Sequence, residues 1–186
     1  MIIYIHGFGS HGLGGKASAF RAYFEDKDEE FIAPSLSYVP ELAIQTLEEL
    51  IKVCNNVKLI GSSLGGYYAL YLANKYNLKA CLINPSIYPY KTLSKVEGKV
   101  LNYYDNSYFE WNISHLDMLK KYEIEVPDQS KVLLLLQKGD EVLDYTEAVK
   151  KLPDATMVVE EGGDHGFVQI ERHFERVERF LNEPKA

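Results

Sequence analysis

The sequence predicts an α/β fold in which a mainly parallel sheet of about six strands carries helices on both faces. Short apolar runs alternate with amphipathic stretches along most of the 186 residues, a pattern typical of repeated βαβ units. The run Lys131–Gln137 (KVLLLLQ) is apolar on both of its sides, as expected for a buried strand in the middle of a parallel sheet. A hydrophobic content of 46% is enough to fill the core of one domain of this length.

The first half of the chain is expected to alternate four strands with three helices. The expected strands are Ile2–Ile5, Phe31–Leu36, Val57–Gly61 and Ala80–Asn84. The expected helices are Lys16–Phe24, Pro40–Val53 and Leu64–Tyr76. The second helix is the clearest, because its apolar residues recur at helical spacing and Pro40 stands at its start, where a missing N–H costs nothing.

This alternation is interrupted after the fourth strand. Residues 86 to about 128 contain many polar residues and no strong strand pattern, so we expect a cap-like insertion within a single domain that spans residues 1–186. The remaining expected elements are a strand at Lys131–Gln137, a helix at Tyr145–Lys151, a strand at Thr156–Glu160 and a helix at Val168–Leu181. Right-handed crossovers place the loops after the strands on one rim of the sheet, where ligands bind in open α/β folds.

A glycine-rich stretch, HGFGSHGLGGKA, directly follows the first expected strand. Gly7–Gly12 matches the G-x-G-x-x-G fingerprint of dinucleotide-binding turns, and Gly15-Lys16 resembles the end of a phosphate-binding P-loop. The fingerprint fails because more glycines follow it where a helix should begin, and because the second strand does not end in an acidic residue. The P-loop fails because Ser10 replaces a required glycine and Ala17 replaces a required Ser or Thr.

A second glycine-containing turn follows the third expected strand. Gly61-Ser62-Ser63-Leu64-Gly65 fits G-x-S-x-G, in which the serine occupies a sharp turn between a strand and a helix. Such a turn lifts the hydroxyl above the sheet edge, beside a helix N-terminus that favours negative charge. A motif centred on Ser62 would need glycine at position 60, which is Ile60, so Ser63 is the predicted nucleophile. The competing interpretation is a turn whose two serines only cap the helix.

A serine hydroxyl needs a base to take its proton, and the base needs an acid to orient it. Enzymes that use this turn carry the partners in the chain order serine, acid, histidine. Asp140 follows the fifth expected strand and His165 follows the sixth, so both fall on the rim that carries Ser63. The sequence therefore predicts a triad of Ser63, His165 and Asp140.

The other acidic and histidine residues of this region fit other roles. Asp144 stands where a helix begins and suits an N-cap, whereas Asp154 precedes a strand at the opposite edge. Asp164 adjoins His165 in sequence, and Glu141 is expected in solvent. The remaining histidines fall in an ordered loop, an exposed loop, the insertion and the last helix: His6, His11, His115 and His173.

Acyl transfer also needs two donors for the negative charge that develops on the carbonyl oxygen. One is the backbone N–H of the residue after the nucleophile, here Leu64, and the other comes from the loop after an earlier strand. His6-Gly7-Phe8-Gly9 occupies that place, so we predict the Phe8 N–H as the second donor, with His6 ordering the loop. The glycines then face a transient oxyanion instead of a phosphate.

These residues resemble the YqiA-like small bacterial esterases of the α/β-hydrolase superfamily over nearly the whole chain. The resembling blocks are YIHGF (4–8), KAS (16–18), IGSSLGGYYA (60–69), INP (83–85), LLQKGDEVLDY (135–145) and GGDHGF (162–167). The resemblance implies a compact α/β-hydrolase fold without the first two strands of larger members, and esterase activity on short acyl chains. It also assigns the triad positions to Ser63, Asp140 and His165. The sequence departs from the family in the loop at 9–15 and in the insertion after Pro85, which both bear on substrate preference.

Composition excludes several partners. The net charge of −7 argues against nucleic acid or an anionic membrane as the main partner. The longest aliphatic run, Val132–Leu136, is far shorter than the roughly 20 residues that span a bilayer. No basic segment precedes the first apolar run, so we expect no signal peptide and a cytoplasmic location. Cys54 and Cys81 are expected as buried free thiols. We expect no metal and no other cofactor, since no Cys/His cluster has ligand spacing.

The sequence thus predicts a serine esterase that hydrolyses small acyl esters, with thioesters as a further possibility, through an acyl-enzyme. Two alternatives stay open, a binding or regulatory protein that uses the same pocket as a ligand sensor and a hydrolase of another bond such as a peptide. Aromatic residues of the insertion either line an acyl pocket or pack the cap onto the sheet. They are Tyr88, Tyr90, Tyr103, Tyr104, Tyr108, Phe109, Trp111 and Tyr122.

Overall fold

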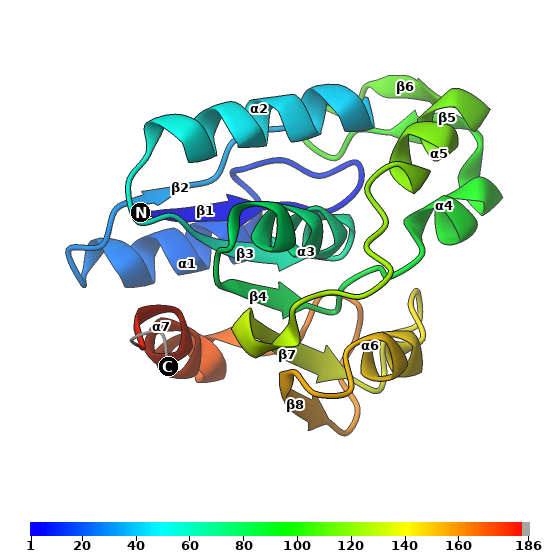
Figure 1. The fold of residues 1–186 in the computed structure, drawn as a ribbon. Coiled ribbons are helices and arrows are strands. Elements are labelled where there is room, and N and C mark those ends of the chain that lie inside the picture. Colours follow the sequence, from blue (N-terminus) through cyan, green and yellow to red (C-terminus); the bar gives the residue numbers. More distant parts are fainter. Residues whose placement is uncertain (184–186) are drawn as a thin grey trace.

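A six-stranded sheet forms the centre of the protein, and all its neighbouring strands run parallel (Figure 1). The computed structural model describes residues 1–183. The strands, in their order across the sheet, are β2 (Phe31–Ile32), β1 (Ile2–Ile5), β3 (Lys58–Ser62), β4 (Ala80–Ile83), β7 (Val132–Gln137) and β8 (Thr156–Glu160). The predicted parallel sheet of about six strands is confirmed.

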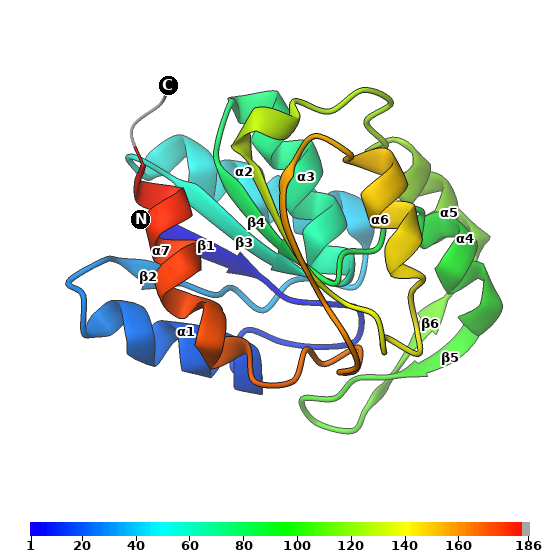
Figure 2. The ribbon, with the colours of Figure 1, turned by 90° about the horizontal axis from the view of Figure 1, so that it is seen from below.

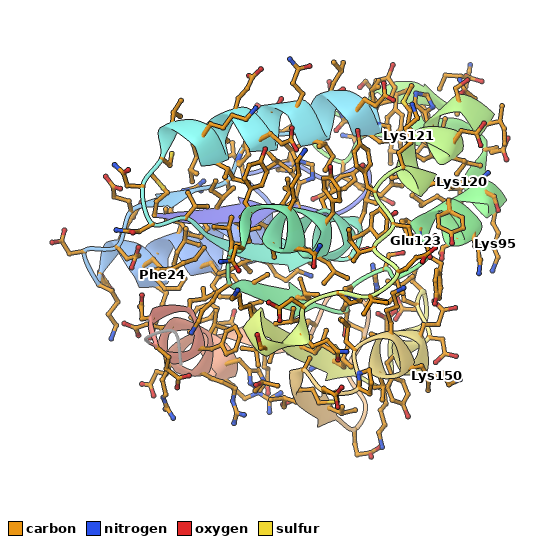
Figure 3. All side chains as sticks on the ribbon, in the orientation of Figure 1. Phe24, Lys95, Lys120, Lys121, Glu123 and Lys150 are labelled. Carbon is orange, nitrogen blue, oxygen red and sulfur yellow. The ribbon has the colours of Figure 1, made fainter. Side chains whose placement is uncertain are left out.

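Helices cover both faces of this sheet, as predicted (Figures 1 and 2). One face carries α2 (Pro40–Val53), α3 (Leu64–Tyr76) and α6 (Tyr145–Lys151), and the other carries α1 (Gly15–Glu25) and α7 (Phe174–Asn182). Side chains of β1 alternate between the two cores: Ile3 and Ile5 join the first, and Ile2 and Tyr4 join the second. Phe24 of α1, labelled in Figure 3, belongs to the second core and is fully buried.

The insertion after β4 forms a cap at the end to which the parallel strands point (Figures 1 and 2). Its elements are α4 (Pro89–Thr92), the 3₁₀ helix η1 (Leu93–Val96), β5 (Gly98–Leu101), β6 (Tyr108–Trp111) and α5 (Ile113–Lys120). A further 3₁₀ turn, η2 (Gln129–Lys131), leads into β7.

The expectation of no strong strand in this insertion is wrong. Strands β5 and β6 pair antiparallel, with Val100 opposite Phe109. The Asn102 N–H donates to the Ser107 carbonyl at 2.8 Å, and Asn106 in the turn has a left-handed φ of 59°. Strands of four residues are too short for an alternation of apolar and polar residues to be detected. The turn residues between β5 and β6 were the feature of the sequence that indicated a hairpin.

Strand β2 ends four residues earlier than predicted. Pro34 has no N–H to donate to a ladder. Beyond it, the Leu36 N–H donates to His6 Nε2 at 2.9 Å, and Ser35 Oγ accepts from the Gly12 N–H at 3.1 Å. The chain therefore leaves the sheet after Ile32 and binds the glycine-rich loop.

The final helix begins later than the predicted Val168. The Val168 N–H donates to the Gln137 side chain at 2.9 Å, and Gln169 has a left-handed φ of 57°. Both features prevent a regular helix there. A 3₁₀ turn, η3 (Ile170–His173), follows, and α7 begins at Phe174.

No helix among residues 1–183 is long and apolar enough to cross a membrane. Both cysteines are free thiols, as expected. Cys81 is buried in β4, whereas Cys54, directly after α2, is partly exposed, so the expectation of burial is wrong for Cys54.

Candidate active site

Ser63 occupies the turn between β3 and α3, in the strand–turn–helix context that its motif predicts. Its backbone has φ 56° and ψ −122°, a combination that is strained for a residue other than glycine. A Cβ at Gly61 would lie 2.2 Å from the Gly65 carbonyl oxygen, and a Cβ at Gly65 would lie 2.0 Å from the Ile5 carbonyl oxygen. These two glycines therefore let the start of α3 pass closely over β3 and β1.

The structure brings Ser63, His165 and Asp140 together from three loops at one rim of the sheet. His165 Nε2 lies 3.0 Å from Ser63 Oγ, and His165 Nδ1 lies 2.9 Å and 3.0 Å from the two carboxylate oxygens of Asp140. A carboxylate only accepts hydrogen bonds, so Nδ1 carries the proton and Nε2 is left to accept from the serine hydroxyl. The Asp140 side chain is 2% exposed and the His165 side chain 25%.

The Asp140 carboxylate is held in its ionised form by hydrogen bonds. Burial acts to raise its pKa, but donation from His165 and from the backbone N–H groups of Leu143 and Val142 lowers it, and the net pKa is below the usual value. The two backbone bonds measure 2.8 Å and 2.9 Å. Glu141 is exposed as expected, but its carboxylate also accepts the backbone N–H of His165 at 3.1 Å.

The two predicted oxyanion donors lie on the same cavity as Ser63 and His165. Within residues 1–183, the structure gives no hydrogen-bond acceptor to the backbone N–H of Phe8 or of Leu64, so both are free to donate. The Phe8 ring packs against the cap, with centroid separations of 4.7 Å to Trp111 and 5.6 Å to Phe109.

His6 orders the loop before Phe8. Its Nδ1–H donates to the Gly7 carbonyl at 2.9 Å, and its Nε2 accepts the Leu36 N–H at the same distance. Burial lowers the pKa of His6, so the neutral ring that these two bonds require is favoured. A Cβ at Gly7 would lie 3.2 Å from Ser63 Cβ, so the ordered loop runs directly beside the candidate nucleophile.

The site opens into a cavity of about 650 Å³. This volume is within the usual range for small-molecule pockets. Apolar side chains from α3, the cap and the loop after β7 form much of the wall: Leu64, Pro89, Leu93, Val96, Val100, Val142 and Leu143. The glycine-rich loop and the start of α1 add Ser10, His11 and Lys16.

Of the eight aromatic residues in the insertion, Tyr103 alone lines this cavity. Trp111 is fully buried and stacks on His115, with ring centroids 4.8 Å apart. Tyr104 and Tyr108 are exposed. Most of these rings therefore pack the cap or face solvent. The Tyr103 N–H donates to the Gly9 carbonyl at 2.9 Å, which joins the hairpin to the glycine-rich loop.

Two buried amides that the sequence interpretation missed hold the loop that carries His165. Asn84 Nδ2 donates to the carbonyl oxygens of Asp164 at 3.0 Å and His165 at 3.4 Å, while Asn84 Oδ1 accepts the Gln137 N–H at 3.0 Å. Gln137 Oε1 accepts the N–H groups of Val168 at 2.9 Å and Asp164 at 3.3 Å. Both amides stand at the ends of strands, the only sequence signal that distinguishes them from ordinary turn residues.

Ser86 is a third residue that the sequence interpretation missed. Its side chain lines the cavity and is buried, and its Oγ has no hydrogen-bond partner within residues 1–183. Its backbone N–H donates to the Ser63 carbonyl at 3.0 Å. A buried hydroxyl without a partner has lost its hydrogen bonds to water, and this lowers stability.

The rival residues have other roles. Asp144 caps α6 by accepting the Thr146 N–H at 2.9 Å, as predicted. His173 is buried and its ring lies 2.9 Å from a Glu160 carboxylate oxygen, which fits the expected packing role. His115 closes the N-terminal capping box of α5. Among residues 1–183, no group of three or more His, Cys, Asp or Glu side chains is placed to share a metal ion.

Residues 1–182 match the family described as "Uncharacterised protein family (UPF0227)". The chain belongs to this family. UPF0227 protein VP0969 of Vibrio parahaemolyticus is 26% identical to it, over 98% of this chain and 99% of that protein. UPF0227 protein YcfP of Salmonella gallinarum is also 26% identical, over 97% of this chain and 98% of that protein. The predicted relationship to YqiA-like proteins is confirmed at the level of family and fold.

Several solved structures share the fold of this UPF0227 protein. Mouse alpha/beta hydrolase domain-containing protein 10 has a TM-score of 0.76 and 19% identity, over 97% of this chain and 89% of that one. Monoacylglycerol lipase of Paleococcus ferrophilus has a TM-score of 0.71 and 16% identity, over 97% and 93%. Est1E of Butyrivibrio proteoclasticus, solved with ferulic acid, has a TM-score of 0.72 and 14% identity, over 97% and 87%. These likenesses confirm the predicted α/β-hydrolase fold.

Proposed function

We propose that this UPF0227 protein is a serine esterase that hydrolyses short-chain carboxylic esters, and also acyl thioesters, through a covalent acyl-enzyme. The observation that carries the proposal is the position of His165, whose two ring nitrogens contact Ser63 Oγ and the Asp140 carboxylate at 3.0 Å and 2.9 Å. This arrangement gives a serine hydroxyl both a base for its proton and an acid that orients the base.

In the first step, Ser63 Oγ attacks the carbonyl carbon of the ester while His165 Nε2 takes the hydroxyl proton. Asp140 holds the imidazole by Nδ1–H and stabilises the imidazolium that forms. The N–H groups of Phe8 and Leu64 donate to the carbonyl oxygen as it becomes negative. The carbon–oxygen bond to the alcohol then breaks, and the alcohol leaves with the proton from His165.

In the second step, water attacks the acyl-enzyme carbonyl and gives a proton to His165 Nε2. The bond to Ser63 Oγ breaks, the serine takes that proton back, and the carboxylic acid leaves. The buried Asp140 serves both steps without changing its own protonation.

The lining of the cavity supports an acyl group. An apolar wall of Leu93, Val96, Val100 and Leu143 suits an acyl chain, and a volume of about 650 Å³ also leaves room for the alcohol or thiol part of the substrate. Two proteins of the same fold carry names that describe ester chemistry, the monoacylglycerol lipase and the esterase Pf2001 of Pyrococcus furiosus. Their names support ester substrates for this chain as well.

Hydrolysis assays with two serine variants test the proposal. Wild type is expected to cleave p-nitrophenyl acetate and butyrate, and Ser63→Ala should lose at least about 10³-fold in kcat/KM. Ser114→Ala is the matched control, because Ser114 is exposed on α5 and does not line the cavity. It should stay within about threefold of wild type.

Two outcomes would contradict the proposal. Equal activity of wild type and Ser63→Ala would show that Ser63 is not the nucleophile. Specific labelling of Ser63 by a fluorophosphonate, with no turnover of any ester or thioester in a panel of acyl lengths, would favour a ligand sensor that retains the triad.

A further inference from the structure

Lys16 is a cationic side chain on the wall of the candidate active-site cavity. It is the lysine of the Gly15-Lys16 pair at the end of the glycine-rich loop, and the proposed hydrolysis gives it no role. Its Nζ donates to the Gly166 carbonyl at 2.7 Å. An ammonium group has three donors, so this bond leaves two of them for a ligand.

No carboxylate lines the cavity wall beside Lys16. None of the described residues that line the cavity is Asp or Glu, although the whole chain has 27 acidic against 20 basic residues. Lys16 forms no ion pair within residues 1–183. Asp140 and Asp164 are the carboxylates that influence it, and Asp140 is already bound to His165, Val142 and Leu143.

The surroundings of Lys16 favour the arrival of an anion. Burial lowers its pKa more than Asp164 and Asp140 raise it, so the ammonium lacks the solvation that it has in water. Helix α1 begins at Gly15, and its first turn contains no acidic residue and no side-chain cap. The partial positive charge of this helix end has the same sign as the lysine.

The hydrogen bond to the Gly166 carbonyl places Lys16 beside the loop that carries His165. Gly166 directly follows His165, whose Nε2 gives its proton to the departing alcohol or thiol. The apolar side chains suited to an acyl chain come from α3, the cap and the loop after β7, whereas Lys16 comes from α1.

We infer that Lys16 binds a carboxylate or phosphate group carried by the alcohol or thiol part of the substrate. The substrate class is therefore an acyl ester or thioester of an anionic alcohol or thiol, and Lys16 is the residue that selects it. The inference rests on the proposed function, because it uses the leaving-group side of the same reaction.

The test compares two esters that differ in charge and match in shape, 3-butyryloxybenzoate and 3-butyryloxybenzamide. Wild type is expected to have the higher kcat/KM for the benzoate. Lys16→Met should reduce that value by about 10- to 100-fold and change the benzamide by less than about threefold. Lys16→Arg, which keeps the charge, should retain part of the preference, and salt should weaken it.

The matched control is Lys95→Met. Lys95 is exposed on the cap and points away from it in Figure 3, and it does not line the cavity. This variant changes the net charge by the same amount, so it should leave the ratio of the two kcat/KM values as in wild type. An equal change in both lysine variants would overturn the inference.

Binding to Ser63→Ala separates this inference from the proposed function, since this variant can bind the intact esters without cleaving them. Calorimetric titration should give tighter binding of the benzoate than of the benzamide, and Lys16→Met in the same background should remove the difference.

Equal binding of both esters would overturn the inference even if wild type is an esterase. An equal loss of activity on both esters in Lys16→Met would show that Lys16 only positions the His165 loop, and would also overturn it. A charge-dependent binding difference without turnover in wild type would instead contradict the proposed function and retain the anion site.

Discussion

Asn84 Nδ2 donates a hydrogen bond to the Asp164 carbonyl oxygen at 3.0 Å, and so ties the end of β4 to the loop that carries His165. The same side chain accepts the Gln137 N–H, which comes from the end of β7. One buried amide therefore joins two neighbouring strand ends to the loop of the candidate base. Because proton transfer from Ser63 depends on the position of His165, we expect Asn84 to act as a positioning residue.

Replacing Asn84 by Ala should impair catalysis, although Asn84 does not line the cavity. The change removes both bonds to the His165 loop and the bond to the Gln137 N–H, so this buried N–H loses its partner. We expect kcat/KM to fall by about 10- to 100-fold with KM little changed. The free energy of unfolding should fall by about 1–3 kcal/mol.

Asn77→Ala is the matched control for this variant. Asn77 also has a left-handed backbone, with φ 57° against 38° for Asn84, but it stands at the end of α3, away from the site. It should therefore lose stability through the same backbone effect and keep wild-type kcat/KM. Equal kcat/KM losses in both variants, measured where circular dichroism shows them folded, would exclude a specific role for Asn84.

The protein should lose stability as the pH falls below about 6.5, the ordinary pKa of histidine. Burial lowers the folded-state pKa of His115 and of His6. As the pH falls, these histidines therefore bind protons in the unfolded chain before they do so in the folded protein. The free energy of unfolding decreases between the unfolded-state pKa and the lower folded-state pKa. Urea unfolding at several pH values measures this loss.

His115→Gln should reduce that loss. His115 Nδ1 accepts the Asn112 N–H at 3.1 Å in the capping box of α5, and Gln at this position can still accept that bond but does not titrate. The difference in unfolding free energy between about pH 7.5 and pH 5.5 should be smaller in the variant than in wild type. A larger pH dependence in the variant would contradict the sign of the His115 shift.

Ser86→Ala should not destabilise the protein. The buried Ser86 hydroxyl has no partner in the described part of the chain, so its removal relieves a desolvation cost and should leave the unfolding free energy equal or about 1 kcal/mol higher. Ser35→Ala is the comparison, because Ser35 Oγ accepts the Gly12 N–H at 3.1 Å and its loss should lower stability. A lower melting temperature for Ser86→Ala than for Ser35→Ala would show that the Ser86 hydroxyl has a partner.

The strands of the six-stranded sheet and the core of the candidate site could be predicted because their signals are local. Close backbone contacts around Ser63 require glycine at positions 61 and 65, so five consecutive residues are enough to predict the turn. The order of the strands along the chain then places Asp140 and His165 on the same rim. No knowledge of side-chain packing is needed for either step.

The residues that were missed depend on contacts between distant parts of the chain. Asn84 bonds to a residue 80 positions away, and Gln137 bonds to Val168, 31 positions away. Apart from its place at the end of a strand, nothing near either amide in sequence distinguishes it from a turn residue. The β5–β6 hairpin was missed for a different reason, since four-residue strands such as Gly98–Leu101 carry too little periodicity to detect.

The most direct test of the proposed nucleophile and base is covalent labelling by a fluorophosphonate, read by mass spectrometry. We expect one adduct, in the tryptic peptide 59–75, which fragmentation assigns to Ser63 and not to the neighbouring Ser62. His165→Ala should label at least about 100-fold more slowly, because the serine hydroxyl then has no base. An adduct on another residue would show that Ser63 is not the nucleophile, and labelling of His165→Ala at the wild-type rate would show that His165 is not its base.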